Sequence, residues 1–150
     1  MDLYIVRHGE ALPAASDAAR QLSDHGRAEV EAVANAIHKR GASVRQIRHS
    51  GRVRAQETAE IIGGVLLPPA GVIETPGIHP DDPIEPFAFS LFGERESLMM
   101  VGHLPFVARL VGFLTSGNTD RSPARFPTAT VTYLQGEDDH WDLVWTEHAP

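Results

Sequence analysis

The first residues that could do chemistry are an arginine and a histidine at the end of a predicted strand. Residues 3–6 form an apolar run, and Arg7, His8 and Gly9 follow it directly. A neutral imidazole can act as a nucleophile near pH 7, and a guanidinium group suits a phosphate dianion. By itself the pair is better explained as the basic end of an edge strand, so other segments must decide between the two interpretations.

A second histidine occupies the same kind of position later in the chain. Residues 97–101 are almost continuously apolar, which is typical of a central buried strand, and Gly102 and His103 come next. Leu104 then precedes Pro105, which predicts the start of a helix over 106–114. Two histidines that end two buried strands are harder to explain as ordinary turn residues than one would be.

Two arginines stand at the start of a helix predicted over 52–62. Ser50 follows the preceding strand, and Arg52 and Arg54 come in the first helical turn, where positive charge opposes the helix dipole. They are either solvated surface residues or part of an anion site. The second interpretation has a physical basis, because free N–H groups at a helix N-terminus and guanidinium groups attract the same anion.

The remaining segments predict the elements that hold these residues. Further strands are expected at 44–49, 72–74, 129–134 and 141–146, and further helices at about 24–40 and 86–91. Strands that alternate with helices predict a mostly parallel sheet covered on both faces. We therefore expect an α/β fold, a three-layer α/β/α sandwich whose mostly parallel central sheet ends in an antiparallel C-terminal hairpin, formed as one domain by residues 1–150.

This architecture would bring the candidate residues together. The carboxyl ends of parallel strands meet at one edge of a sheet, so Arg7, His8, Arg54 and His103 are expected to lie within reach of a common anion. Two arginines, two histidines and nearby backbone N–H groups form a site complementary to a phosphoryl group.

Composition restricts the classes of function. The formal net charge of −7 disfavours nonspecific binding to nucleic acid or to an anionic membrane, so we expect neither partner. The absence of cysteine excludes disulfides, thiolate metal sites and cysteine nucleophiles. We expect no cofactor and no metal, because His8, His103, Glu10 and Asp81 lack the spacing of metal ligands. No targeting or membrane-spanning pattern is recognisable, which predicts a cytoplasmic location.

Four motifs, in this order, resemble those of the histidine phosphatase superfamily. They are Arg7-His8-Gly9-Glu10, Leu22-Ser23-x-x-Gly26, the segment 50–58 in which Arg54 follows Ser50 by four residues, and Gly102-His103. The short length and the segments 54–58 and 101–105 are most similar to the SixA-type phosphohistidine phosphatase branch. The resemblance covers residues 1–111 and is weaker through the final hairpin.

The resemblance implies a hydrolase that acts through a covalent phosphohistidine intermediate on His8. Arg7, Arg54 and His103 would bind the phosphoryl oxygens during catalysis. Further substrate contacts would come from Gly9, Glu10, Ser50 and Leu104. The implied substrate is phosphohistidine on a protein, such as a phosphotransfer domain.

The sequence departs from the superfamily pattern at two places. Residues 75–82 lack the Leu-x-Glu context in which the family's mutases and phosphomonoesterases carry a general acid, and the candidates there are Glu74, His79, Asp81 and Asp82. Gly51 replaces a proline that is common in the family, which predicts a looser turn after Ser50.

The missing acid bears on the substrate. An imidazole that leaves phosphohistidine needs a proton less than an alkoxide does, so the departure favours an N–P bond as the substrate. Two alternatives stay open: a small-molecule phosphomonoesterase that uses an acid from the 74–82 loop, and a noncatalytic phosphate-binding module, which the presence of His8 disfavours.

Overall fold

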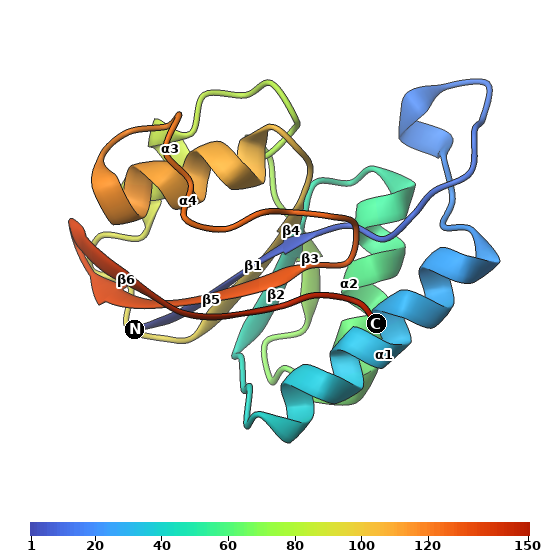
Figure 1. Ribbon diagram of the computed structural model, residues 1–150, viewed down its shortest axis with the longest axis horizontal. Helices are drawn as coiled ribbons and strands as arrows, with labels where there is room; N and C mark the ends of the chain where they lie inside the picture. Colours follow the sequence, from blue (N-terminus) through green and yellow to red (C-terminus); the bar gives the residue numbers. More distant parts are fainter.

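The computed structural model describes residues 1–150 and contains one six-stranded sheet with helices on both faces (Figure 1). The strands are β1 (Asp2–Arg7), β2 (Gln46–His49), β3 (Val72–Glu74), β4 (Leu98–Gly102), β5 (Val131–Glu137) and β6 (His140–Glu147). Their order across the sheet is β3-β2-β4-β1-β5-β6. The first four in this order are parallel, while β5 and β6 are antiparallel to their neighbours. The predicted fold class is confirmed.

Helices α1 (Asp24–Lys39) and α2 (Val53–Leu66) cover one face of the sheet, and α3 (Glu85–Ser90) and α4 (Phe106–Ser116) cover the other (Figure 1). A short 3-10 helix, η1 (Asp17–Ala19), lies in the connection between β1 and α1. None of the helices combines the length and the apolar character that a membrane crossing requires.

Strand β1 contributes to both hydrophobic cores. Leu3 and Ile5 pack on the side of α3 and α4, whereas Tyr4 and Val6 pack on the side of α1 and α2. Successive side chains of a strand point to opposite faces, so a shift of one residue would exchange the two sets. The two cores therefore fix where β1 ends, and with it the position of the residues that follow.

Helix α1 begins where Ser23 caps it, as the sequence predicts. The Ser23 hydroxyl accepts a hydrogen bond from the Gly26 amide at 2.9 Å. A Cβ at Gly26 would lie 2.2 Å from the carbonyl oxygen of Glu10, so this turn packs directly against the backbone that leaves β1. Glycine at position 26 thus supports the segment that carries His8.

The predicted end of this helix at residue 62 is wrong, because α2 continues through Gly63 and Gly64 to Leu66. A Cβ at Gly63 would lie 2.7 Å from Cγ2 of Val72 in β3, whereas a Cβ at Gly64 would meet nothing within 4 Å. Gly63 therefore marks close packing of the helix on the sheet and not the end of the helix.

The final hairpin is confirmed, but its turn is shorter than predicted. Strand β5 runs through Gly136 to Glu137, and β6 starts at His140, which leaves a two-residue turn at Asp138 and Asp139. Asp138 adopts a φ of 53°, in the left-handed region that aspartate tolerates and tight hairpin turns require.

Candidate active site

Strand register places His8 beside His103. In the parallel pair of β1 and β4, the last residues of the two strands, Arg7 and Gly102, lie opposite each other. The residue that follows each strand is a histidine, so the two histidines are neighbours. Their ring centroids are 5.0 Å apart, and both side chains are buried. The backbone is joined as well, since the His8 amide donates to the Gly102 carbonyl at 3.0 Å.

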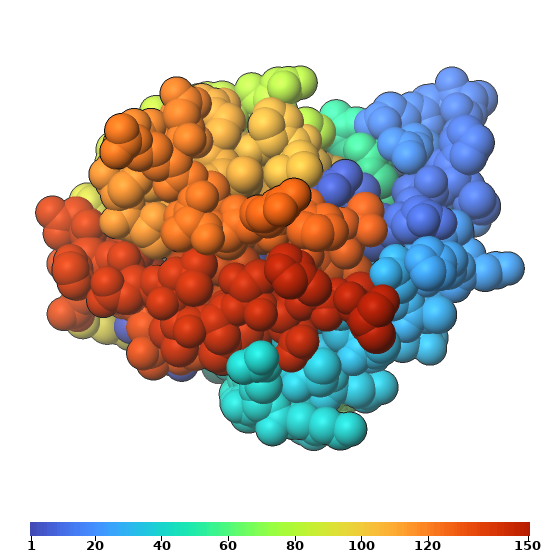
Figure 2. Space-filling model, in the orientation of Figure 1, coloured from blue at the N-terminus to red at the C-terminus, as the bar shows by residue number.

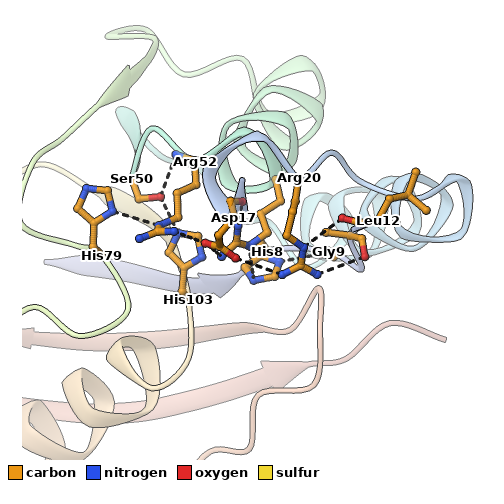
Figure 3. A network of polar contacts seen from close by, with 11 residues as sticks. His8, Gly9, Leu12, Asp17, Arg20, Ser50, Arg52, His79 and His103 are labelled. Carbon is orange, nitrogen blue, oxygen red and sulfur yellow. Dashed lines mark hydrogen bonds and ion pairs between the residues drawn. The ribbon is translucent and has the colours of Figure 1, made fainter. Parts of the chain in front are cut away.

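Ser50 joins the pair from the other side of β4. Strand β2 runs parallel to β4 with His49 opposite Val101, which brings Ser50 to the same edge of the sheet. The Ser50 hydroxyl lies 2.6 Å from Nε2 of His103 (Figure 3). The ends of three neighbouring parallel strands therefore supply Ser50, His103 and His8 in that order.

The hydrogen bonds of His8 determine its tautomer. Nδ1 lies 2.7 Å from the carbonyl oxygen of Gly9. A carbonyl can only accept, so Nδ1 carries the proton and Nε2 carries the lone pair. Desolvation of the buried ring, reinforced by the charges of Arg54 and Arg7, lowers the pKa of His8 to about 4. At neutral pH the imidazole is therefore uncharged, with a nucleophilic nitrogen at Nε2.

His103 has an unused polar atom in the same cluster. Burial, together with the neighbouring His8 and Arg54, lowers the pKa of His103 to about 3, so this ring is also neutral near pH 7. Nδ1 of His103 is buried and has no hydrogen-bond partner. The tautomer in which the Ser50 hydroxyl donates to Nε2 leaves an N–H at Nδ1 without an acceptor, which an anionic oxygen would satisfy.

Arg7 and Arg54 concentrate positive charge next to the histidines. The Arg54 side chain is only 5% exposed, and its Nε donates to Nε2 of His8 at 3.3 Å. Arg7 donates from Nη1 to the Phe126 carbonyl at 2.9 Å, and its buried Nε has no partner. Burial and then the charge of Arg54 lower the pKa of Arg7. Two guanidinium groups held this close favour an anion between them.

The other predicted contact residues are placed differently. The Gly9 amide donates to Thr58 Oγ1 at 3.0 Å and is already satisfied, and a Cβ at Gly9 would lie 2.7 Å from Cγ2 of Val30 in α1. The Glu10 carboxylate accepts from the Ser23 hydroxyl at 2.8 Å, at the start of α1. Leu104 lies at the surface, next to His103. Their contacts to a substrate stay predictions, and packing against α1 accounts for the glycine.

Thr58 supports the site, although the sequence indicated no role for it. Its hydroxyl accepts from the Gly9 amide and donates to the Arg54 carbonyl at 2.8 Å. It thereby connects the turn after β1 to the first turn of α2. The available signal was its spacing, because a residue four positions after Arg54 lies on the same helix face.

A second group of polar residues lies at the mouth of the site (Figure 3). Asp17 of η1 accepts from Nη2 of Arg54 at 3.1 Å and forms an ion pair with Arg52. The backbone carbonyl of Asp17 accepts from Nη1 of Arg54 at 2.9 Å, and Arg20 lies 3.5 Å from the other carboxylate oxygen. Nothing in the polar 12–21 segment predicted this, because the contact forms only when the loop folds back over α2.

Of the four candidate acids, only His79 has a hydrogen bond into this network. Arg52 donates from Nε to Nδ1 of His79 at 3.2 Å. Asp82 accepts from the His79 amide at 2.9 Å and thus stabilises its own turn. Glu74 lies beside Gly51. No hydrogen bond links Asp81 to the site.

Gly51 does not loosen the turn after Ser50, contrary to the prediction. It adopts a φ of 90°, which a residue with a side chain rarely reaches. A Cβ there would also lie 2.7 Å from the carboxyl carbon of Glu74. Glycine is therefore the residue that this turn requires, and Ser50 is held firmly against His103.

The structure contains no group of three or more histidine, cysteine, aspartate or glutamate side chains placed to hold a metal ion. Its larger hollows lie away from the strand ends as well. One of about 390 Å³ is lined by Phe89, Phe92, Phe113 and Trp141, and it belongs to the other end of α4. None of these hollows is lined by the histidine–arginine cluster, which lies at the edge of the sheet.

The fold and the cluster together define an α/β enzyme of the phosphoryl-transfer class. The model of the histidine phosphatase superfamily, branch 1, matches residues 3–78, and the chain belongs to this superfamily. A relative, phosphohistidine phosphatase SixA of Escherichia coli (strain K12), is 31% identical in an alignment 136 residues long that covers 87% of this chain and 83% of the relative.

Solved structures show the same fold. The protein histidine phosphatase SixA complexed with tungstate superimposes with a TM-score of 0.89 at 27% identity, covering 99% of this chain and 97% of that one. The putative phosphohistidine phosphatase SixA from Agrobacterium tumefaciens gives a TM-score of 0.80 at 24% identity, covering 99% and 98% of the two chains.

Proposed function

We propose that this chain is a phosphatase that removes the phosphoryl group from phosphohistidine on a protein, through a covalent intermediate on His8. The observation that carries the proposal is the state of His8: it is neutral, its proton is held at Nδ1 by Gly9, and its Nε2 lone pair faces Arg54. The relative named phosphohistidine phosphatase SixA supports the choice of substrate.

In the first step, Nε2 of His8 attacks phosphorus and the bond from phosphorus to the substrate's imidazole nitrogen breaks. The leaving imidazole takes up one proton from solvent water, while the Nδ1 proton of His8 stays at the Gly9 carbonyl. Arg7, Arg54 and Nδ1–H of His103 contact the equatorial oxygens, where they offset the charge that these oxygens carry in the transition state. The positive charge that develops on the His8 ring is stabilised by the Gly9 carbonyl at Nδ1.

In the second step, a water molecule attacks phosphorus and the bond to Nε2 of His8 breaks. Inorganic phosphate leaves, and the lone pair returns to Nε2. The same arginines serve both steps. The phosphorus atom moves only slightly as its bond passes from the substrate nitrogen to Nε2 of His8, and then from Nε2 to the oxygen of water.

A protein-borne substrate is compatible with the shape of the site. The cluster stands at the ends of the strands, next to the exposed residues 12–19 and Leu104, and such a position suits a phosphoryl group carried on a protruding side chain of a bulky partner. Signal transduction and a cytoplasmic setting are part of the proposal, because the substrate it names is a phosphotransfer domain.

One observation favours a second candidate, a phosphatase for small phosphate monoesters. His79 is joined to the site through Arg52, and once Arg52 releases Nδ1, His79 could carry a second proton to an alkoxide leaving group. The two substrates therefore make different demands: His79→Ala should impair monoester hydrolysis and leave phosphohistidine hydrolysis nearly unchanged.

The deciding experiment compares the wild-type chain with His8→Ala on a phosphohistidine-bearing phosphotransfer domain and on phosphate monoesters. We expect phosphohistidine to be the faster substrate and His8→Ala to lower turnover by about 10³-fold or more. Acid-labile phosphate should be trapped on wild-type His8 during turnover. His25→Ala is the matched control, because His25 is an exposed residue of α1 outside the cluster.

Three outcomes would contradict the proposal. Faster turnover of phosphate monoesters than of phosphohistidine would contradict the proposed substrate. Substantial residual activity in His8→Ala, or a trapped phosphoryl group that maps to another residue, would remove the covalent mechanism.

A further inference from the structure

Asp17 places a carboxylate where the site is built to receive an anion. It lies against Arg52 (Figure 3) and also forms an ion pair with Arg54. The same Arg54 contacts Nε2 of His8. Partial burial alone would raise the pKa of Asp17, but the hydrogen bond and charge of Arg54 and the charge of Arg52 outweigh it and lower the pKa. The carboxylate is therefore ionised near pH 7.

Asp17 takes one N–H from Nη1 of Arg54 with its carbonyl and one from Nη2 with its carboxylate, and a phosphoryl group beside His8 would find both positions partly occupied. This guanidinium is almost fully buried, and its nitrogens are divided between His8 at Nε and Asp17 at Nη1 and Nη2. A phosphoryl group bonded to Nε2 of His8 needs the donors of Arg54 that face the ring. The carboxylate of Asp17 and the phosphoryl group are therefore two anions that compete for the same guanidinium.

The loop that carries Asp17 is built so that it can move. Every residue from 12 to 19 is exposed, and no hydrophobic side chain anchors this stretch in either core. The base of the loop is closed independently of its tip, by a β-bridge between Ala11 and Leu22 and by the Leu12 amide bonded to the Gln21 carbonyl. The loop stands out from one corner of the molecule (Figure 2). Segments with so few buried contacts open at little cost in free energy.

The contact itself is also of a kind that exchanges readily. The Asp17 side chain is 53% exposed, and an ion pair with such a solvated carboxylate stabilises little. A phosphoryl dianion carries more charge and more acceptor oxygens, and it forms stronger paired hydrogen bonds with guanidinium groups. We therefore expect Arg54 to bind the phosphoryl group more strongly than the Asp17 carboxylate.

We propose that Asp17 is an internal anion that occupies the arginines of the empty site and is displaced from Arg54 by the incoming phosphoryl group. Asp17 thereby sets the affinity of the site for phosphoryl oxygens, and Arg52 retains the carboxylate at the mouth when Arg54 is taken. The inference rests on the proposed function, because it describes how the same site takes up its substrate.

The alternative is that Asp17 is a permanent positioning residue for Arg54. The two roles predict opposite effects of its removal. An internal competitor lowers the affinity for anions, so its loss raises that affinity. A positioning residue holds Arg54 in place, so its loss disorders the guanidinium and lowers the affinity.

Binding of tungstate, a tetrahedral dianion, distinguishes these two roles of Asp17 without any turnover. In calorimetric titrations of the full chain, Asp17→Asn should bind tungstate about 3- to 10-fold more tightly than the wild type. Asp17→Glu, which keeps the charge, should stay near the wild-type affinity. Asp120→Asn is the matched control: it makes the same change in net charge at an exposed carboxylate that forms no ion pair, and it should not alter binding.

A crystal structure of the wild-type chain with tungstate supplies the second readout. We expect tungstate beside His8 and the Asp17 carboxylate more than hydrogen-bond distance from Arg54. Weaker tungstate binding by Asp17→Asn, or an Asp17–Arg54 contact that persists beside bound tungstate, would overturn the inference. A failure to hydrolyse phosphohistidine would instead refute the proposed function and leave the tungstate result unaffected.

Discussion

Nε of Arg54 lies 3.3 Å from Nε2 of His8, on the side of the ring opposite to the Gly9 carbonyl. The two contacts act together. The carbonyl holds the proton at Nδ1, and the guanidinium disfavours a second proton at Nε2 because both would be positive. A histidine held between an acceptor and a cation in this way is kept as a neutral nucleophile with a defined direction of attack.

The first prediction concerns pH. The pKa of His8 falls from its ordinary value of 6.5 to about 4, so kcat/KM for phosphohistidine should stay level from about pH 8 to pH 5.5 and decline only as pH approaches 4. A stopped-flow pH profile measures this. A decline centred near pH 6.5 would show that the fold does not hold His8 neutral.

The same pKa shift predicts how stability depends on pH. The unfolded chain binds a proton at His8 near pH 6.5, whereas the folded chain resists it until about pH 4, so the free energy of unfolding should fall as pH drops between these values. His8 alone should account for a loss on the order of 2–3 kcal/mol. Urea unfolding at pH 7 and pH 4.5 tests it, and His8→Ala should show a smaller loss than the wild type.

Ser50→Ala should lower kcat about tenfold, because His103 loses the hydroxyl 2.6 Å from its Nε2 and with it a fixed orientation. In a His103→Ala background, the same substitution should have almost no further effect. Steady-state kinetics of the four chains measures this coupling. Independent, additive losses would mean that Ser50 acts on something other than His103.

Thr58→Val should lower the free energy of unfolding by about 1–3 kcal/mol, because the buried Gly9 amide loses its acceptor while the side-chain volume is kept. The turnover number should also fall, since Gly9 fixes Nδ1 of His8. Thr115→Val is a matched control: its hydroxyl makes the same bond back along the helix, to Val111, with no second partner. Urea denaturation measures the free energy of unfolding of both variants. An equal loss in Thr58→Val and Thr115→Val would contradict the role of Thr58.

The two neighbouring glycines of α2 should respond in opposite directions to alanine. Gly64→Ala should raise the free energy of unfolding by about 0.5–1 kcal/mol, because the site is open and alanine is the better helix former. Gly63→Ala should lower it, because the new Cβ would lie 2.7 Å from a β-branched side chain, Val72. Denaturant midpoints of the two variants test the close approach of α2 to β3.

Much of the fold follows from local patterns. The apolar runs before Arg7 and before His103 predict buried strands correctly, because a strand covered on both faces has few alternatives to an unbroken apolar sequence. The end of α2 could not be predicted in the same way. Gly63 and Gly64 look alike in sequence, and only contact with Val72 distinguishes a packing glycine from a terminating one.

The cluster of His8, His103, Ser50 and Arg54 was also within reach of the sequence. Each of these residues follows a strand or begins a helix, and parallel strands bring such ends to one edge whatever their exact length. The order of the strands, which puts Ser50 and His8 on opposite sides of His103, was not specified by any local pattern.

What the sequence determined by itself was therefore the set of reactive groups and the edge of the sheet at which they stand, because periodicity and strand ends are local properties. Only the tertiary structure decided their protonation and their partners. Burial, which no single segment controls, makes His8 neutral, and the return of an exposed loop over α2 brings Asp17 to Arg54. Both depend on residues that are close in space and distant along the chain.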